Sequence, residues 1–188
     1  MSKILAIDIG PEFSAYCRLD SGNLIRGHNW FGNDAMLTYV REEHGRGSIA
    51  VIESPQAQDR PLGKLLRDTI WWAGRFAEAL DSTGVEWHEA EERDVALWLT
   101  GNRSASNPAI LQGLKDVFGD KTKQPCGECG SAGSVRGSRG LKKCPACKGN
   151  KFLTLPGPLA GMNEHERSAL AAAWWYWKKH LEQRAVRA

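Results

Sequence analysis

The chain has 188 residues, of which 41% are hydrophobic and 25% are charged, as in ordinary water-soluble globular proteins. Its 25 basic and 22 acidic residues give a net charge of +3, which excludes a histone-like polycation. No apolar run approaches the roughly 20 residues that a membrane-spanning helix needs, so no membrane partner is expected. Asp8 follows the first residue too closely for the apolar core of a signal peptide, so we expect a cytoplasmic protein.

Strands and helices are predicted to alternate along most of the chain. Residues 4–7 and 49–52 are continuous apolar runs, which is typical of strands buried on both faces. The first run is expected to form an antiparallel meander with strands over 14–19 and 24–30. The other expected elements are a strand over 85–89 and helices over 34–43, 61–82, 91–99, 108–118 and 164–184, the last two with Asn107 and Asn163 as N-caps. This order predicts a mixed α/β layer fold.

Two carboxylates occupy equivalent places at the ends of the two buried strands. Asp8 and Glu53 each directly follow four apolar residues. If these strands are parallel neighbours, both side chains lie at the sheet edge where α/β proteins bind ligands. Two close carboxylates repel each other unless a cation lies between them, and Mg²⁺ prefers oxygen ligands. The shared context therefore favours a metal site over two unrelated strand-end or capping acids.

The order and spacing of several segments resemble those of RuvC-type Holliday junction resolvases. The similar segments are residues 4–10, 50–53, 62–64, 85–119 and 165–171. The first reads ILAIDIG, and the last places His165 and Ser168 at the start of the final helix. Outside residues 121–158, the resemblance covers nearly the whole chain.

This resemblance implies an RNase H-like mixed α/β sheet flanked by helices. It also implies a metal-dependent endonuclease that acts, as a homodimer, on branched DNA such as four-way junctions. Two Mg²⁺ (or Mn²⁺) ions would be held by Asp8, Glu53 and His165. One ion would activate water and the other would stabilise the leaving 3′-oxygen. Such a small, elaborated form is similar to resolvases of bacteriophages, which would place it in the host cytoplasm.

The final helix departs from the family pattern at Ser168, where the family commonly has a carboxylate. On an ideal helix Glu164 lies about 40° from Ser168, whereas Glu166 lies about 160° away. Glu164 is therefore the candidate for the missing catalytic carboxylate, and Glu166 fits the N3 position of a capping box. His165 could instead be a surface histidine. The loop over residues 54–60 also lacks the aromatic residue that the family often uses to enter a junction.

A segment rich in glycine and cysteine interrupts the resemblance. We expect a nuclease domain of residues 1–120 and 159–188 and a zinc-binding insertion of residues 121–158. The insertion contains two C-x-x-C pairs with fourteen residues between them, formed by Cys126, Cys129, Cys144 and Cys147. Four thiolates at this spacing suit one structural Zn²⁺ in a hairpin, and a redox pair is the alternative.

Positive charge is concentrated in this insertion. Residues 121–151 contain eight basic residues and one acidic residue, which give this segment a net charge of +7. Because the whole chain carries +3, the rest of the chain carries −4. We expect phosphate contacts from Arg136, Arg139, Lys142 and Lys143. The alternative is a solvated hairpin with a purely structural zinc.

Eight tryptophans are an unusually high number for this length. Trp174 and Trp177 share one helical stripe with Leu170 and Leu181, which is typical of a core. A dimer interface or a base-stacking surface is the alternative.

Three other functions or folds are consistent with these residues. One is an RNase H-fold nuclease that acts on flaps, forks or RNA. Another is a catalytically impaired, zinc-dependent protein that binds branched DNA, because Ser168 replaces a carboxylate. A third is an actin-like or sugar-kinase fold, because Asp8-Ile9-Gly10 resembles the phosphate loop of that fold. That fold normally needs two such domains, which 188 residues cannot hold.

Overall fold

Two compact units make up the chain in the computed structural model. The larger consists of Met1–Leu114 with Gly161–Ala188, and the smaller consists of Lys115–Ala160. The residues that the structure describes are 3–20, 24–43, 48–54, 63–119, 121–130, 132–137 and 140–182. Among these residues, no helix combines the length and the apolar character needed to cross a membrane.

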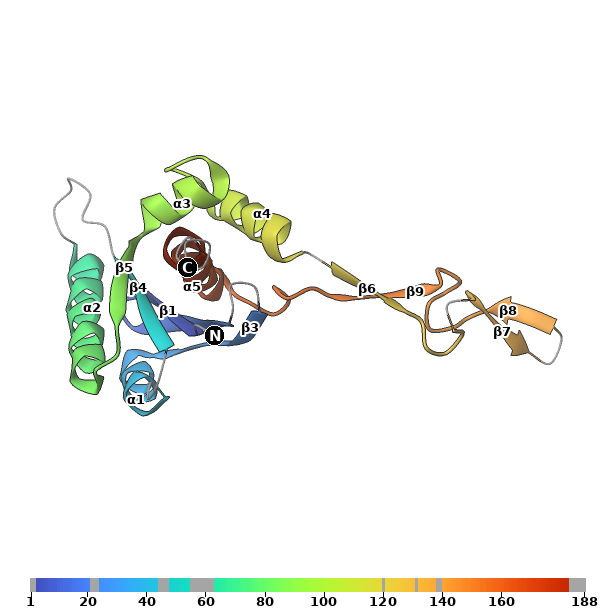
Figure 1. Ribbon diagram of the computed structural model, residues 1–188, viewed down its shortest axis with the longest axis horizontal. Helices are drawn as coiled ribbons and strands as arrows, with labels where there is room; N and C mark the ends of the chain where they lie inside the picture. Colours follow the sequence, from blue (N-terminus) through green and yellow to red (C-terminus); the bar gives the residue numbers. More distant parts are fainter. Residues whose placement is uncertain are drawn as a thin grey trace. The chain divides into compact units, whose positions relative to one another are not determined.

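A five-stranded mixed sheet with the order β3-β2-β1-β4-β5 forms the centre of the larger unit (Figure 1). The strands are β1 (Lys3–Ile9), β2 (Phe13–Asp20), β3 (Leu24–Gly32), β4 (Ser48–Ser54) and β5 (Trp87–Glu91). Strands β1, β2 and β3 form the predicted antiparallel meander, β4 runs parallel to β1, and β5 runs parallel to β4.

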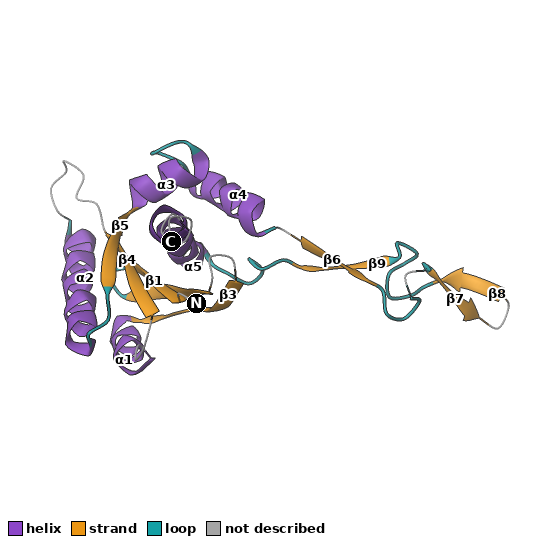
Figure 2. Cartoon of the chain, in the orientation of Figure 1, coloured by secondary structure: helices purple, strands orange, loops and turns teal. Residues whose placement is uncertain are grey.

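Helices cover both faces of this sheet, as Figure 2 shows by colour. They are α1 (Asn33–Glu43), α2 (Lys64–Thr83), α3 (Glu92–Thr100), α4 (Asn107–Phe118) and α5 (Glu164–Tyr176), which continues as a π-helix, η1 (Trp177–Glu182). Helices α1 and α2 lie on one face of the sheet, and α5 lies on the other, inside α3 and α4 (Figure 1). The mixed α/β fold with flanking helices is therefore confirmed.

Most predicted boundaries differ from the structure by one to three residues, and backbone hydrogen bonds explain two of these differences. Strand β5 begins two residues later than expected, because the N–H of Val85 donates to the Leu80 carbonyl at the end of α2 (3.1 Å). Helix α4 includes Asn107, so Asn107 is not its N-cap. The carbonyl of Ser106 instead accepts from the N–H of Ile110 (3.0 Å). Residues 61, 62, 183 and 184 of the predicted helices lie outside the described residues.

The alternation of each strand gives the sheet two different faces. On the α1 and α2 face, Leu5, Ile7 and Ile52 join a buried cluster centred on Phe76. On the other face, α5 packs against β1, β2 and β4. The buried face of α5 includes four alanines, namely Ala169, Ala171, Ala172 and Ala173. Their small side chains let α5 lie close to the sheet.

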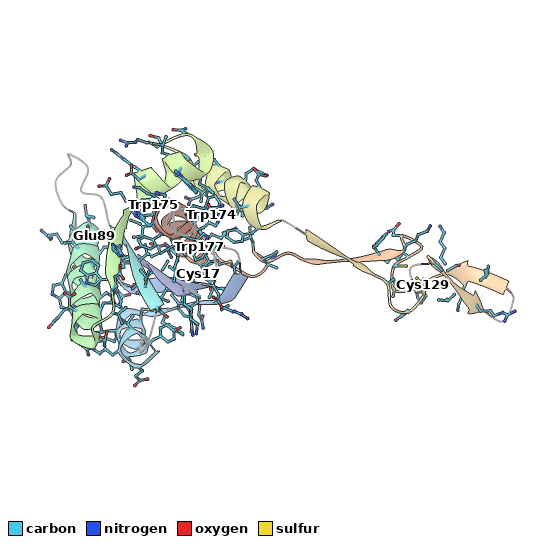
Figure 3. All side chains as sticks on the ribbon, viewed as in Figure 1. Cys17, Glu89, Cys129, Trp174, Trp175 and Trp177 are labelled. Atoms are coloured by element: carbon cyan, nitrogen blue, oxygen red, sulfur yellow. The ribbon has the colours of Figure 1, made fainter. Side chains whose placement is uncertain are left out.

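The tryptophans of the last helix lie partly in this packing (Figure 3). Trp175 is buried, whereas Trp174 and Trp177, which the helical stripe placed in the core, are half-buried. Trp174 makes an edge-on contact with Trp98 of α3, with ring centroids 4.7 Å apart. The ring of Trp174 therefore lies between α5 and α3 and not against the sheet.

The smaller unit contains two short pairs of antiparallel strands. Strand β6 (Lys121–Pro125) pairs with β9 (Phe152–Pro156), and β7 (Ser134–Gly137) pairs with β8 (Gly140–Lys143). Between them, Gly133 has a φ of 80°, and a Cβ at this residue would lie 2.8 Å from the carbonyl oxygen of Gly149. Only glycine fits this close approach of two backbone segments.

Candidate functional site

Asp8 and Glu53 lie directly opposite each other on the parallel strands β1 and β4. The two strands are thus neighbours, and both acids lie at the carboxyl ends of their strands, as expected. The alternation of β1 and β4 puts both side chains on the sheet face that α5 covers.

A cavity of about 370 Å³ lies over this edge of the sheet. Its lining residues are Asp8, Ile9, Glu53, Leu66, Thr69, Glu92, Asn107, Glu164, His165 and Ser168. All four residues that the sequence assigned to the catalytic centre, namely Asp8, Glu53, Glu164 and His165, therefore line one cavity. Their catalytic and metal-binding roles remain predictions.

The sequence analysis missed Glu92, the first residue of α3. It lines the cavity and acts electrostatically on Glu53. Glu92 directly follows β5, the third parallel strand of the sheet. The same rule that selected Asp8 and Glu53 would select this position. However, the sequence of β5, WHEAE, lacks the continuous apolar run that marked the other two strands.

The carboxylate of Glu53 is enclosed, and its Oε2 atom has no hydrogen-bond partner among the described residues. Burial raises the pKa of Glu53 well above its ordinary value, and the nearby charges of Asp8 and Glu92 raise it further. An enclosed acid of this kind either holds a proton or faces a cation.

His165 forms the contact between α5 and the acid of β1. Its Nδ1 atom lies 2.9 Å from Oδ2 of Asp8, and this hydrogen bond raises the pKa of the imidazole. Its Nε2 atom lies 4.0 Å from Oε1 of Glu164. The carboxylate of Glu164 also accepts a hydrogen bond from Nδ2 of Asn107 (3.2 Å). His165 is thus an exposed side chain that contacts Asp8 and lines the cavity, and its role as a metal ligand stays a prediction.

The first turn of α5 is fixed by Glu166. The predicted capping box is confirmed: Asn163 Oδ1 accepts from the Glu166 N–H (2.9 Å), and Glu166 Oε2 accepts from the Asn163 N–H (2.7 Å). The other oxygen of Glu166 lies 2.8 Å from Nδ1 of His28 on β3. Glu166 is thus a structural acid that ties the turn carrying His165 to the sheet.

The donor set at the sheet edge suits a hard divalent cation. Asp8, Glu53 and Glu92 offer carboxylate oxygens, and the unpartnered Oε2 of Glu53 is a free acceptor for an ion. Within the described part of the chain, however, no three side chains here bring their ligand atoms as close as the four cysteine sulfurs. Asp8 is instead engaged by His165. The three acids thus line one cavity, but their ligand atoms do not form a cluster as tight as that of the cysteines.

The four cysteines of the smaller unit form a compact cluster. The atoms Cys126 Sγ and Cys144 Sγ are 3.8 Å apart, Cys129 Sγ and Cys147 Sγ are 3.7 Å apart, and all four lie within 4.8 Å of one another. A tetrahedral Zn²⁺ with Zn–S bonds of about 2.3 Å places neighbouring sulfurs about 3.8 Å apart. The backbone N–H of Gly133 donates to Cys129 Sγ (3.3 Å). Four such thiols could bind a zinc ion.

The fifth cysteine, Cys17, belongs to the larger unit, whereas the four cysteines of the cluster belong to the smaller unit. It is fully buried on β2, and burial raises its thiol pKa to about 12. It therefore remains protonated and packs as a small apolar side chain.

Three of the four predicted phosphate-binding residues lie on the β7–β8 hairpin. Arg136 is opposite Leu141, and Lys142 and Lys143 follow on β8, which is exposed throughout. Arg139 lies outside the described residues. The hairpin thus presents a basic surface.

Comparison with known proteins shows the fold. No family model matches the chain, and no curated protein matches it in sequence. The structure of Thermus thermophilus RuvC aligns with a TM-score of 0.60 at 14% identity, covering 94% of this chain and 95% of RuvC. T. thermophilus RuvC in complex with a Holliday junction substrate aligns with a TM-score of 0.58 at 15% identity, over 93% and 92% of the two chains. The chain therefore has a RuvC-like, RNase H-like fold, as the sequence resemblance implied. A ROK family protein from Streptococcus pneumoniae in complex with sucrose reaches a TM-score of only 0.34 over 53% of this chain and 37% of that protein.

Replacement of Glu53 by glutamine is expected to stabilise the metal-free protein. Because the folded state raises the pKa of Glu53, that state binds the proton more tightly, and stability falls as pH rises above the ordinary value of 4.5. Glutamine keeps a polar group at this position but removes the buried charge, so the gain comes from the charge, and each 1 kcal/mol corresponds to about 2–4 °C in melting temperature at this chain length. Thermal unfolding in a chelator between pH 4 and 8 measures the difference.

Glu89→Gln on β5 is the matched control, because Glu89 is exposed (Figure 3). We expect the melting temperature of Glu53→Gln to exceed that of the wild type increasingly as pH rises, and Glu89→Gln to follow the wild type. Equal melting curves for all three proteins would show that Glu53 is not under electrostatic strain.

Loss of a cluster thiol is expected to remove bound zinc. The purified wild type should contain about one Zn²⁺ per chain, whereas Cys126→Ser and Cys144→Ser should each lose it because three thiolates and a hydroxyl bind zinc weakly. Atomic absorption measures the metal content. Cys17→Ala, which lacks the remaining cysteine, should keep its zinc. A wild type without zinc and with four freely reactive cluster thiols would contradict the assignment.

Proposed function

We propose that the chain is a metal-dependent, structure-selective endonuclease that cleaves phosphodiester bonds in branched DNA such as four-way junctions. The observation that carries this proposal is the pairing of Asp8 with Glu53 on parallel strands, with an unpartnered carboxylate oxygen inside a cavity that His165 also lines. A RuvC-like fold supports it, because one structural neighbour is RuvC with a Holliday junction substrate.

In this proposal Asp8, Glu53 and His165 hold Mg²⁺ or Mn²⁺, two ions per site, with Glu92 as an additional acid. Such ions supply a hydroxide nucleophile at neutral pH and stabilise charge on the leaving 3′-oxygen. The protein's own residues set the geometry. His165 carries a proton at Nδ1 toward Asp8 before metal binds, and Glu166 holds the turn from which His165 extends. Glu164 lies beside His165 as the acid nearest to Ser168 on the helix.

The smaller unit is proposed to bind one structural Zn²⁺ and to contact DNA phosphates through Arg136, Arg139, Lys142 and Lys143. The sulfur–sulfur distances support the first part, and the exposed lysines of β8 support the second. The homodimer, the host-cytoplasmic location, the bacteriophage origin and the domain limits at residues 120 and 159 rest on the sequence alone and are part of the same proposal.

A second candidate function is a catalytically impaired protein that binds branched DNA. Ser168 lines the cavity where a further carboxylate is expected, which favours this alternative. Cleavage of synthetic junctions, forks and RNA–DNA hybrids with Mg²⁺ or Mn²⁺ separates the candidates. Binding without cleavage by the wild type, together with cleavage by Ser168→Asp, would establish the impaired protein.

Asp8→Asn and Glu53→Gln are each expected to abolish junction cleavage. Loss of a metal-binding carboxylate should cost more than the roughly 10–100-fold that changes around metal ligands cost. Junction affinity should be kept or should rise, because a negative charge near the phosphates is removed. Gel-based cleavage and binding assays measure both, with Glu89→Gln as the control. Near-wild-type cleavage by either variant would rule out that carboxylate as a catalytic group.

Neutralisation of the β7–β8 hairpin is expected to weaken the salt dependence of DNA binding. Each phosphate contact contributes about −0.9 to the slope of log K against log salt, so Arg136, Lys142 and Lys143 changed together to glutamine should flatten it by about 2–3 units. Fluorescence anisotropy at several salt concentrations measures the slope.

The control variant carries Lys3→Gln and Arg26→Gln, two changes at the opposite end of the sheet from Asp8. It should leave the slope nearly unchanged, and cleavage at saturating DNA should persist in both variants. An unchanged slope for the hairpin variant would show that these three residues do not contact phosphates.

A further inference from the structure

A second cavity, of about 350 Å³, adjoins the carboxylate cavity in the larger unit. It is lined by Gly10, Pro11, Glu12, Phe13, Ser14, Ala15, Trp30, Leu65 and His165. His165 lines both cavities, so whatever occupies the second cavity lies next to whatever is bound at Asp8. We call this second cavity the aromatic pocket.

Exposed hydrophobic side chains form the walls of the aromatic pocket. Phe13 and Trp30 are each 50% exposed, and Leu65 is 64% exposed. The rings of Phe13 and Trp30 have centroids 5.0 Å apart and are tilted by 45°. Several large apolar side chains left open to solvent in one place are typical of a binding surface.

The backbone holds the pocket in a fixed shape. The N–H of Gly10 donates to the carbonyl of Phe13 (3.0 Å), and a Cβ at Gly10 would lie 2.4 Å from that oxygen, so only glycine fits this turn. The Ser14 hydroxyl donates to Asn33 Oδ1 (2.6 Å), and Asn33 Nδ2 donates to the Gly10 carbonyl (3.0 Å). The turn that carries Phe13 is therefore formed before any ligand binds.

Strand register places the aromatic rings on the same sheet face as the acids. Ala15 is the partner of both Asp8 on β1 and Trp30 on β3, so all three side chains point to one face. Phe13 is two residues before Ala15 on β2 and shares that face. The carboxylate cavity and the aromatic pocket thus lie side by side on one face of the sheet.

The chemistry of the aromatic pocket fits a flat, uncharged ring and not a phosphate. The hydroxyl of Ser14 is already used by Asn33, and Glu12 would repel an anion. The pocket volume lies within the roughly 300–1,000 Å³ that is typical of small-molecule sites. Aromatic side chains bind the faces of nucleobases by stacking, whatever the base.

We propose that the aromatic pocket binds an unstacked nucleobase of the DNA strand whose phosphate lies at Asp8 and Glu53. This rests on the proposed nuclease function. In a linear duplex both faces of a base are covered by its neighbours, so the pocket stays empty. At a branch point a base can leave the stack and enter it. Phe13 and Trp30 thereby select branched over linear DNA.

The test uses the full-length, zinc-loaded protein with Ca²⁺ and a four-way junction that carries 2-aminopurine at one position beside the branch. Stacking on an aromatic ring quenches 2-aminopurine fluorescence. The wild type should quench the probe at one position or more. Phe13→Leu and Trp30→Leu, which keep apolar volume but remove the ring, should lose the quench and weaken junction binding by roughly 5–150-fold. Binding to linear duplex should not change.

Two variants keep the test decisive. Trp71→Leu removes a tryptophan on α2 that is also exposed but lies outside the pocket, and it should behave as the wild type. Phe13→Tyr keeps an aromatic ring and should retain the quench. Unchanged binding of linear duplex by Phe13→Leu excludes misfolding as the cause of its lost quench.

The outcomes separate this proposal from the proposed function. In one outcome the wild type cleaves junctions, and Phe13→Leu and Trp30→Leu quench the probe and bind junctions as strongly as the wild type. The pocket then does not bind a base, and the proposed nuclease function is retained. If the wild type quenches the probe but cleaves nothing, the pocket stands and the nuclease fails. Loss of a dimer in Phe13→Leu and Trp30→Leu by sedimentation, with the quench unchanged, would show that a second copy occupies the pocket and would overturn the proposal.

Discussion

The larger unit depends on one arrangement, the pairing of β1 with β4 that sets two carboxylates side by side. Asp8 and Glu53 are register partners, and the sheet cannot separate them without breaking its two central strands. Burial, together with the repulsion from Asp8, raises the pKa of Glu53 and opposes folding of the metal-free protein at neutral pH. Proteins keep such strain where it serves binding or chemistry. A divalent cation would turn the repulsion into attraction.

The rest of the site is built around this pair. Small alanines bring α5 close to the sheet, and the capping box with its link to His28 fixes the turn that carries His165. His165 then lies between two cavities of different character. The carboxylate cavity would suit the metal ions and the phosphate of a scissile bond, and the aromatic pocket would suit a base. Together they would recognise a phosphate whose neighbouring base has left the helical stack.

Much of this arrangement was predictable because continuous apolar runs mark buried strands, and strand ends in α/β sheets form sites. That reasoning identified Asp8 and Glu53, and helix periodicity separated Glu164 from Glu166. It missed Glu92 because β5 lies at the sheet edge and has a mixed sequence. The aromatic pocket was also missed. The pairing of β2 with β3, which brings Trp30 to Phe13, has a register shift between Arg18 and Leu19. Such a shift changes which face of the sheet the following side chains occupy, and the sequence does not reveal it.

The central claim is that Asp8 and Glu53 together form a divalent-cation site, and calorimetric titration of the zinc-loaded protein with Mn²⁺ tests it most directly. We expect saturable Mn²⁺ binding by the wild type and by Glu89→Gln, and its loss in both Asp8→Asn and Glu53→Gln. The heat should fall as pH drops and Glu53 takes up its proton, because the ion and the proton compete for the same carboxylate. Mn²⁺ binding of equal strength in the wild type and in Asp8→Asn would contradict the account.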